Sequence, residues 1–198
     1  MKLKNTPKGV HVLKIMVTLR TVFAVLFLLV TACATVDSVE QLPTATSVDL
    51  SRYVGKWHEI ARLPMWAQQN CVRSTAEYTL LESGEIGVTN TCATAEGQET
   101  SIDGIATTVD PEDEAKLNVV FYQWMADIVS FYTPLNNGNY WILRVDPEYR
   151  HAIVATPDRE YLWILARTPN LPEDTYQELV TFSQRLGFTT ENLIRASP

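Results

Sequence analysis

Residues 55–60 read Gly-Lys-Trp-His-Glu-Ile, and residues 161–167 read Tyr-Leu-Trp-Ile-Leu-Ala-Arg. We interpret the first segment as the strand that opens a closed β-barrel and the second as the strand that returns to seal its base. In an up-and-down barrel the first strand starts and the last strand ends at the same end, so Trp57 and Arg167 are expected to meet there. A guanidinium stacked on an indole stabilises by about 0.5–2 kcal/mol, and its donors can satisfy carbonyl groups of the entering chain. Gly55, Trp57 and Arg167 are therefore predicted to be structural residues of the barrel floor.

Short runs of alternating polar and apolar residues, each bounded by turn residues, fill the chain between these segments. Eight strands are predicted, at 57–63, 73–81, 85–93, 100–109, 115–122, 139–145, 151–156 and 160–167. The pattern indicates an all-β fold, an eight-stranded antiparallel up-and-down barrel that removes exposed edges by closure. One C-terminal helix is expected after Pro172, ending at Gly187 and packing outside the sheet through Leu179, Phe182 and Leu186.

The N-terminal segment is typical of a secretory signal, because basic residues precede an unbroken apolar stretch from Val22 to Val30 that is too short to span a bilayer as a mature helix. Small residues then precede Cys33, which resembles the lipobox at which bacterial lipoproteins are cut and acylated on the cysteine. An ordinary secretory signal with an incidental cysteine is the alternative. The predicted organisation is a lipoprotein signal peptide at 1–32, an acylated tether at 33–47 and a barrel domain at 48–198.

The charge balance excludes several classes of partner. Five of the 16 Lys and Arg and none of the 23 Asp and Glu lie in residues 1–32, so the rest of the chain has a net charge of −12. Such a surface disfavours nucleic acid and adsorption to anionic lipid head groups. Membrane association is therefore expected to come from the lipid anchor on Cys33.

Cys71 and Cys92 form an even pair in a chain that is expected to reach an oxidising space. A disulfide is predicted, and closing this loop would stabilise the fold by about 3 kcal/mol in the chain-entropy model. The predicted topology places Cys71 and Cys92 at the open end of the barrel, so their meeting is geometrically plausible. Two free buried thiols are the alternative.

Alternation along the strands also predicts which side chains face the lumen. Ala76 and Leu80 are expected to point inward with Tyr78. Glu59 and Arg144 could contribute a charged contact to the lumen, but a surface role is favoured for both. Further lumen candidates are Asn90, Val119, Phe121, Tyr140, Tyr161 and Trp163. An aromatic and apolar wall with a few neutral polar groups suits an acyl chain with one polar end, although the same aromatics could instead fill the barrel.

Three segments resemble the lipocalin family: residues 55–62, residues 146–154 (Asp-Pro-Glu-Tyr-Arg-His-Ala-Ile-Val) and residues 161–167. Their order and spacing are similar to those of bacterial outer-membrane lipoprotein lipocalins and the related apolipoprotein D, over about residues 48 to 195. The resemblance implies a ligand cavity lined by the positions of Tyr78, Asn90, Phe121 and Trp163. With the alternation it gives one predicted ligand-binding set: Tyr78, Asn90, Val119, Phe121, Tyr140 and Trp163.

Enzyme motifs find little support. His58-Glu59-Ile60-Ala61-Arg62 is a near miss to the His-Glu-x-x-His zinc motif, but its fifth residue is Arg62 and the segment is predicted as a strand. The sequence also lacks the Gly-x-Ser-x-Gly elbow of many hydrolases. No catalytic residue, metal site or cofactor is therefore predicted.

These inferences combine into one predicted function. We expect a lipocalin anchored in the outer membrane and facing the periplasm, which binds and stores or transports fatty acids, lysophospholipids or similar amphiphiles. A filled barrel with a structural or interaction role, or a lipid-modifying enzyme, are the alternatives. The apolar connection at 123–137 could be a lid, a membrane-touching surface or a homodimer contact, or the flanking strands could simply extend through it.

Overall fold

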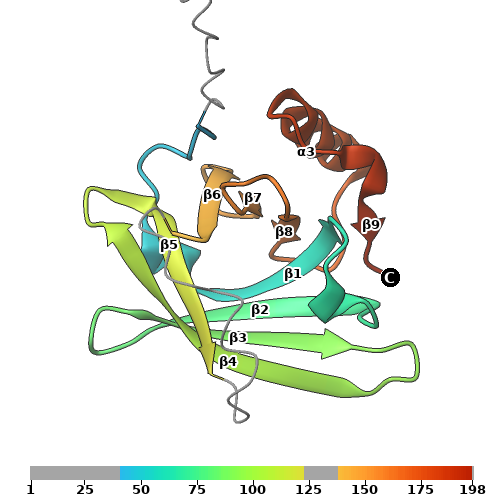
Figure 1. The fold of residues 1–198 in the computed structure, drawn as a ribbon, viewed down its shortest axis with the longest axis horizontal. Coiled ribbons are helices and arrows are strands. Elements are labelled where there is room, and N and C mark those ends of the chain that lie inside the picture. Colours follow the sequence, from blue (N-terminus) through green and yellow to red (C-terminus); the bar gives the residue numbers. More distant parts are fainter. Residues whose placement is uncertain (1–40, 123–137, 198) are drawn as a thin grey trace, which may run out of the picture. The chain divides into compact units, whose positions relative to one another are not determined.

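Eight antiparallel strands close on themselves in the computed structural model, which describes residues 41–122 and 138–197 (Figure 1). Consecutive strands pair, and β1 pairs with both β2 and β8, so the sheet forms the predicted eight-stranded barrel. The strands are β1 (Gly55–Arg62), β2 (Arg73–Leu80), β3 (Ile86–Ala93), β4 (Glu99–Asp110), β5 (Asp113–Tyr122), β6 (Tyr140–Val145), β7 (His151–Ala155) and β8 (Leu162–Ala166). The fold class predicted from the sequence is confirmed.

One end of the barrel is closed by a short helix and an arginine. Asp49 caps the N-terminus of helix α2 (Leu50–Tyr53), and its side chain accepts a hydrogen bond from the backbone N–H of Ser51. It places Tyr53 in the barrel floor beside Trp57, with 4.9 Å between the ring centres. The guanidinium of Arg167 lies 3.9 Å from the centre of the Trp57 ring.

Glycine is required at the start of β1 for two reasons. Gly55 has φ +94°, a backbone conformation that other residues adopt only with strain. A Cβ at this position would also lie 3.3 Å from Nη1 of Arg167. Gly55 therefore lets the chain turn into the barrel while the arginine lies close beneath it.

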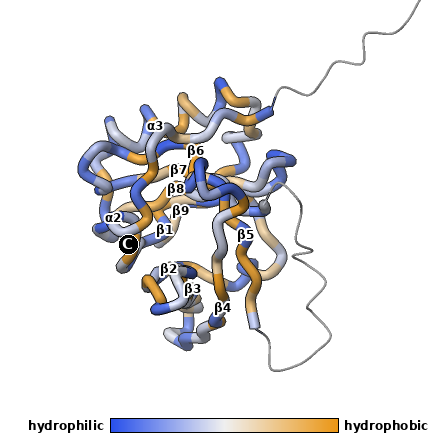
Figure 2. The backbone as a smooth tube through the Cα atoms, turned by 90° about the vertical axis from the view of Figure 1, so that its left-hand side faces the viewer, coloured by the Kyte–Doolittle hydropathy of each residue, from blue (hydrophilic) through white to orange (hydrophobic). Residues whose placement is uncertain are grey.

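Two separate hydrophobic cores flank the barrel wall. The first lies inside the lumen and contains Trp57, Tyr78 and Val119. The second lies between the outer face of the wall and helix α3 (Glu173–Arg185), and it contains Trp141 and Ile164. Because β6, β7 and β8 are covered on both faces, their residues are almost continuously buried, and hydrophobic residues gather where these strands meet α3 (Figure 2).

Helix α3 packs outside the barrel through the predicted residues, since Leu179 is buried in the outer core and the half-buried Phe182 and Leu186 pack against that core. Tyr176 and Ser183 are also buried, and the sequence pattern did not indicate them. Ser183 is tolerated there because its hydroxyl donates to the carbonyl of Leu179 at 2.9 Å. The helix ends at Arg185 with Leu186 as its C-cap, and Gly187 follows with φ +86°, so the glycine lies directly after the cap, as the prediction requires.

A short ninth strand was missed by the sequence analysis. After the 3₁₀ turn η3 (Thr190–Asn192), β9 (Ile194–Arg195) pairs with Ala61 and Arg62 of β1. Strand β1 pairs with β2 only through residues 55–58, so β9 uses the part of that edge which β2 leaves free. A two-residue strand has no alternation pattern to detect.

One residue of β2 that was predicted to face the lumen does not do so. Leu80 was expected to face inward, but it is 52% exposed. The pairing of β1 with β2 ends at Gly55 opposite Tyr78, so the last residues of β2 extend beyond the barrel floor. Alternation gives the side of the strand correctly there, but the lumen no longer lies on that side.

Strands β5 and β6 share only two paired positions, Lys116 with Trp141 and Leu117 with Tyr140. The side chain of Asn139 continues the pairing, because its amide accepts from the backbone N–H of Val119 at 2.8 Å and donates to the carbonyl of Val119 at 2.9 Å. This side chain is buried and acts as a substitute for a peptide group. It holds β6 at the position from which Tyr140 enters the lumen.

Contacts with the barrel begin before residue 48. Leu42 is buried in the outer core, and the backbone N–H of Ala45 donates to the carbonyl of Ile142 at 2.8 Å. Both residues lie within the segment predicted as a tether, so its last part packs on the barrel wall. Across residues 41–122 and 138–197, no helix has the length and apolar character needed to cross a membrane.

Candidate functional site

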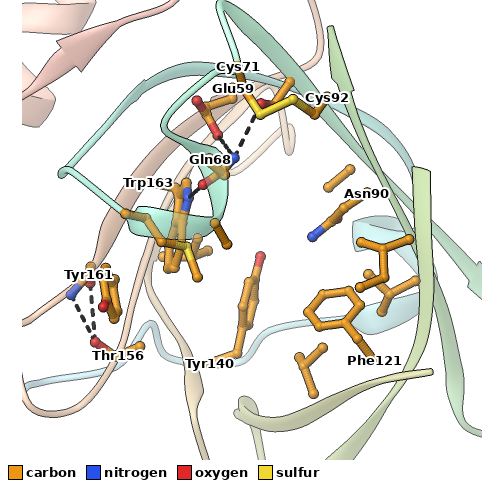
Figure 3. Close-up of a pocket in the computed structure, with 18 of the residues that line it drawn as sticks. Glu59, Gln68, Cys71, Asn90, Cys92, Phe121, Tyr140, Thr156, Tyr161 and Trp163 are labelled. Carbon is orange, nitrogen blue, oxygen red and sulfur yellow. Dashed lines mark hydrogen bonds between the residues drawn. A yellow bond between two sulfur atoms is a disulfide. The ribbon is translucent and has the colours of Figure 1, made fainter. Parts of the chain in front are cut away.

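A cavity of about 620 Å³ occupies the lumen of the barrel. Side chains from all eight strands line it, together with η1 (Trp66–Gln68) and the turn between β7 and β8. Figure 3 shows Tyr140 and Phe121 on one side and the disulfide between Cys71 and Cys92 on the other. The volume falls within the range of about 300–1,000 Å³ that is usual for small-molecule pockets.

All six residues of the predicted ligand-binding set line this cavity: Tyr78, Asn90, Val119, Phe121, Tyr140 and Trp163. Tyr161, which immediately precedes β8, lines it as well, with 6.1 Å between its ring centre and that of Trp163. Alternation along the strands therefore identifies the inner wall correctly at these positions. That these side chains contact a ligand stays a prediction.

Three tyrosine hydroxyls form a chain in the deep part of the lumen. The hydroxyl of Tyr140 lies 2.9 Å from that of Tyr53 and 2.9 Å from that of Tyr78. Burial raises the pKa of Tyr78 to about 12 and the pKa values of the other two well above their ordinary value. The chain is therefore neutral under physiological conditions and offers hydrogen bonds without charge.

Asn90 adds a second polar group to the same region. Its side chain and the Tyr140 hydroxyl both point into the cavity, next to the ring of Phe121 (Figure 3). The Oδ1 atom of Asn90 is buried and has no hydrogen-bond partner among the residues that the structure describes. Phe121 leans toward β4 because Gly104 has no Cβ, which would lie 2.9 Å from the Phe121 ring.

A buried ion pair in the cavity wall shows that the predicted surface position of Glu59 is wrong. Glu59 was assigned to the surface, but it lines the cavity and is buried, and its Oε1 accepts from Arg62 Nη1 at 2.9 Å. Strand alternation would place residues 59 and 62 on opposite faces. A register shift of β1 between Glu59 and Ala61 adds a residue on one side, so both charged side chains turn inward.

Gln68 connects this ion pair to the lumen aromatics. Its Nε2 donates to Glu59 Oε2 at 2.8 Å, and its Oε1 accepts from the indole N–H of Trp163 at 3.0 Å (Figure 3). Arg62 in turn donates to the carbonyls of Gln68 and Cys71, which holds the η1 segment against the wall. Burial raises the pKa of Glu59, although Arg62 and Gln68 oppose the shift.

The predicted disulfide is present and belongs to the cavity wall. Cys71 and Cys92 are bonded, with their Cα atoms 5.3 Å apart, and both line the cavity. Cys71 follows η1 and Cys92 lies near the end of β3. The bond therefore ties the segment that carries Trp66 and Gln68 to β3, the strand that pairs with β2.

The charged side chains that line the cavity are acidic. Among the described residues that line it there is no Lys, Arg or His, whereas Glu59, Asp158 and Glu160 are acidic. Arg144, the other charged candidate, lies outside the barrel and forms a salt bridge with Glu178 of α3. The wall offers neutral hydrogen-bonding groups and negative charge, but no partner for an anion.

Residues 48–198 match the sequence model of the family described as the lipocalin-like domain. The chain belongs to the lipocalin family. Lipocalins are generally non-enzymatic proteins that bind small hydrophobic ligands, and the cavity of this lipocalin has a volume that suits such a ligand.

Curated relatives come from plants, bacteria and animals. Temperature-induced lipocalin-1 of Arabidopsis thaliana is 38% identical over 158 residues, which cover 78% of this chain and 81% of that protein. Outer membrane lipoprotein Blc of Escherichia coli (strain K12) is 33% identical over 167 residues, 84% of this chain and 88% of that protein. Apolipoprotein D of Bos taurus is 31% identical over 141 residues, 67% of this chain and 68% of that protein.

Solved structures show the same fold at lower identity. The cockroach allergen Per a 4 aligns with a TM-score of 0.58 at 18% identity, covering 78% of this lipocalin and 91% of that chain. Insecticyanin from the tobacco hornworm Manduca sexta aligns with a TM-score of 0.56 at 20% identity, covering 79% and 84%. At this level of identity the likeness concerns the fold alone.

Two further predictions concern the connection at 123–137 and metal binding. The apolar connection at 123–137 lies outside them. Within residues 41–122 and 138–197, no three His, Cys, Asp or Glu side chains are close enough together to hold a metal ion.

Proposed function

We propose that this lipocalin binds small amphiphilic lipids such as fatty acids and lysophospholipids, with the acyl chain in the lumen and the polar head group near the mouth. The cavity of about 620 Å³ carries the proposal, because its wall combines aromatic side chains with a few neutral polar groups. Each buried methylene contributes about 0.8 kcal/mol, so a long acyl chain binds usefully without covalent chemistry. Binding of this kind serves storage or transport.

The acidic wall favours some lipids of this class over others. A fatty acid carboxylate would find no cationic side chain among the described lining residues. A zwitterionic lysophospholipid carries an ammonium group that Asp158 and Glu160 attract rather than repel, whereas the charge of Glu59 is balanced by Arg62. We therefore expect lysophosphatidylcholine to bind more tightly than a free fatty acid of the same chain length.

The proposed location is the periplasmic side of the outer membrane, with the protein anchored through an acylated Cys33. The signal-like residues 1–32 and the lipobox-like sequence before Cys33 support it. The relative from Escherichia coli is named an outer membrane lipoprotein. Labelling with palmitate analogues in a bacterial host tests this point, and a Cys33→Ala variant should incorporate no label.

Trp163 provides a direct measurement of ligand binding. It lines the cavity and its indole N–H donates to Gln68, so a ligand in the lumen changes its surroundings. We expect its fluorescence to respond saturably to micromolar lysophosphatidylcholine in the purified, delipidated protein. The absence of any saturable response would contradict the proposal.

A matched pair of variants assigns the signal. Trp163→Phe should reduce the response, because one of the two described tryptophans that line the cavity is lost and only Trp66 remains. Trp141→Phe should keep it, because Trp141 belongs to the outer core between the barrel and α3. If both variants lose the response equally, the lipid acts on the whole fold and not in the lumen.

The two alternative functions make different predictions. A filled barrel would leave no cavity, and the described residues leave one of about 620 Å³. A lipid-modifying enzyme would convert its bound lipid during prolonged incubation with purified protein. Native mass spectrometry of gently purified protein reports bound lipid, its conversion and any homodimer in one measurement.

A further inference from the structure

The indole N–H of Trp163 is already used within the protein. It donates to Gln68 Oε1 at 3.0 Å, between residues that are 95 positions apart in the sequence. Both side chains are half-buried and line the cavity (Figure 3). A ligand chain in the lumen therefore meets the ring of Trp163, while the N–H of that ring is occupied by Gln68.

The Gln68 amide lies between two groups of opposite hydrogen-bonding character. Its Nε2 donates to Glu59 Oε2 at 2.8 Å, and its Oε1 accepts from Trp163. An ionised carboxylate can only accept and an indole N–H can only donate, so the reversed amide would repel both. The hydroxyl of Ser74, 3.2 Å from Nε2, tolerates either orientation because it can donate or accept. Glu59 and Trp163 together therefore determine which way the amide points.

The charge on Glu59 makes this orientation unique. Arg62 Nη1 lies 2.9 Å from Glu59 Oε1, and both side chains are buried. Burial raises the pKa of Glu59, and the adjacent guanidinium opposes this and favours the ionised form. Arg62 thus donates to Glu59, which accepts from Gln68, which in turn accepts from Trp163. The ion pair sets the position of the indole through one intervening amide.

The backbone at Gln68 is held independently of its side chain. Arg62 Nη2 donates to the carbonyl of Gln68 at 2.7 Å and to that of Cys71 at 3.3 Å. Cys71 is also bonded to Cys92. Replacement of the Gln68 side chain should therefore leave η1 in place, so that the position of the indole can be tested separately from the fold.

We propose that Gln68 is a positioning residue that keeps the Trp163 N–H occupied and so excludes hydrogen-bond acceptors of the ligand chain from that side of the lumen. A carbonyl oxygen beside Trp163 would lose its water and find the donor in use, which is unfavourable. A plain hydrocarbon chain has no such group to satisfy. The consequence for ligand choice rests on the proposed function, since it requires an acyl chain in the lumen.

Nuclear magnetic resonance of the isotope-labelled, delipidated protein tests the positioning without a ligand. The indole signal of Trp163 is assigned by its absence in Trp163→Phe, and its N–H should exchange slowly with solvent. Gln68→Ala should accelerate this exchange about tenfold, because the acceptor is lost. Gln69→Ala is the matched control, since Gln69 is the exposed neighbour in the same segment and its loss should leave the exchange rate unchanged.

Glu59→Gln tests whether the charge acts through the amide. A neutral side chain at position 59 can donate as well as accept, so Gln68 is no longer held in one orientation. The exchange of the Trp163 N–H should accelerate even though its direct partner, Gln68, is still present. An exchange rate equal to that of the unchanged protein would overturn the positioning role.

An exchange of the two residues provides the rescue. In Glu59→Gln/Gln68→Glu, the amide at position 59 can accept from Arg62 and donate to the carboxylate at position 68, which still accepts from Trp163. Slow exchange of the N–H should return. A double variant as fast as Gln68→Ala would overturn the proposal. If Glu59→Gln alone does not fold, because Arg62 is left unpaired, the double variant and Gln68→Ala decide the question.

Probe lipids test the consequence for ligand choice by isothermal titration calorimetry. The probes are stearoyl lysophosphatidylcholine and four analogues with one oxo group at carbon 4, 8, 12 or 16 of the acyl chain. Gln68→Ala opens space beside the Trp163 N–H, which can then donate to an oxo group. We expect the preference for the parent lipid over at least one oxo analogue to fall about fivefold in Gln68→Ala and to stay unchanged in Gln69→Ala.

The outcomes separate this inference from the proposed function. Binding of the parent lipid with the same preference in the unchanged protein, Gln68→Ala and Gln69→Ala overturns the exclusion of acceptors and leaves the proposed function standing. Absence of binding for every probe overturns the proposed function and the exclusion together. The exchange rates of the Trp163 N–H then still decide whether Gln68 positions the indole.

Discussion

Arg167, which follows the last strand of the barrel, stacks on the face of Trp57 in the first strand, with 3.9 Å between the guanidinium carbon and the ring centre. Its donors reach the carbonyls of Lys56, Arg52, Tyr53 and Tyr149 at 2.9–3.1 Å. One side chain thus satisfies the backbone of α2, the start of β1 and the turn before β7. The floor therefore combines these hydrogen bonds with the burial of Tyr53 and Trp57.

Arg167→Ala is expected to lower the free energy of unfolding by about 2–4 kcal/mol, because the stacking and several hydrogen bonds are lost together. Arg167→Lys should lose somewhat less, since an ammonium keeps the charge but lacks the planar set of donors. Urea unfolding followed by far-UV circular dichroism measures both. Arg195→Ala is the control: Arg195 also lies over an aromatic ring, Tyr176, and pairs with Glu173, but both charged side chains are exposed, so the loss should stay below about 1 kcal/mol.

Reduction of the disulfide is expected to lower the free energy of unfolding by about 3 kcal/mol, because Cys71 and Cys92 are 21 positions apart and the unfolded chain regains the freedom of that loop. Thermal unfolding with and without a phosphine reductant measures the effect. A Cys71→Ser/Cys92→Ser double variant should match the reduced protein and show no further response to the reductant. A response that persists in that variant would contradict the assignment.

The fold was predictable because it follows from strand alternation and from one topological rule. Tyr78, Asn90 and Val119 are interior residues of regular strands, so simple alternation places them in the lumen, as the structure shows. Trp57 and Arg167 required only the rule that the first and last strands share one end of an up-and-down barrel. No contact energy was needed for either inference.

Irregularity in a strand is one cause of the missed features. The register shift in β1 turns Arg62 to the same side as Glu59, and alternation cannot anticipate it. A similar shift in β6 between Ile142 and Arg144 alters the faces of that strand. The pairing of Tyr140 with two other hydroxyls was equally invisible, because it joins residues of α2, β2 and β6.

The buried ion pair predicts an unusual pH dependence for Arg62→Met. Burial raises the pKa of Glu59 and Arg62 opposes that rise, so removal of Arg62 should raise it further. An acid whose pKa is higher in the folded than in the unfolded state stabilises most below its unfolded value, near 4.5, and this stability is lost as the pH rises through the folded value. The variant should therefore lose least stability near pH 4.5, where only the hydrogen bonds of Arg62 to Gln68 and Cys71 are missing, and should lose about 3–5 kcal/mol at high pH.

Glu59→Gln separates this explanation from simple loss of packing. The variant leaves Arg62 charged at every accessible pH, so its loss of unfolding free energy should not shrink near pH 4.5 in the way expected for Arg62→Met. The double variant should lose less than the sum of the two single variants, since neither charge is then left unpaired. Denaturant unfolding of all four proteins at several pH values gives the comparison.

Asp146 gives the opposite pH dependence. Its buried carboxylate accepts from the backbone N–H groups of Arg150 and His151 and from the Arg150 side chain. Burial alone would raise its pKa, but the hydrogen bonds from Arg150 and His151 outweigh burial and lower it below 3.8. A carboxyl group with a lowered pKa stabilises the fold above its pKa in the unfolded chain, and this stability is lost as the pH falls through its pKa in the folded protein.

Asp146→Asn should therefore lower the free energy of unfolding by about 1–3 kcal/mol at pH 7 and by progressively less below about pH 3.8, measured by denaturant unfolding. The exposed Asp103→Asn, which loses only its contact with Thr89, should change stability by less than about 0.5 kcal/mol, and an equal loss in both variants would contradict the special role of Asp146.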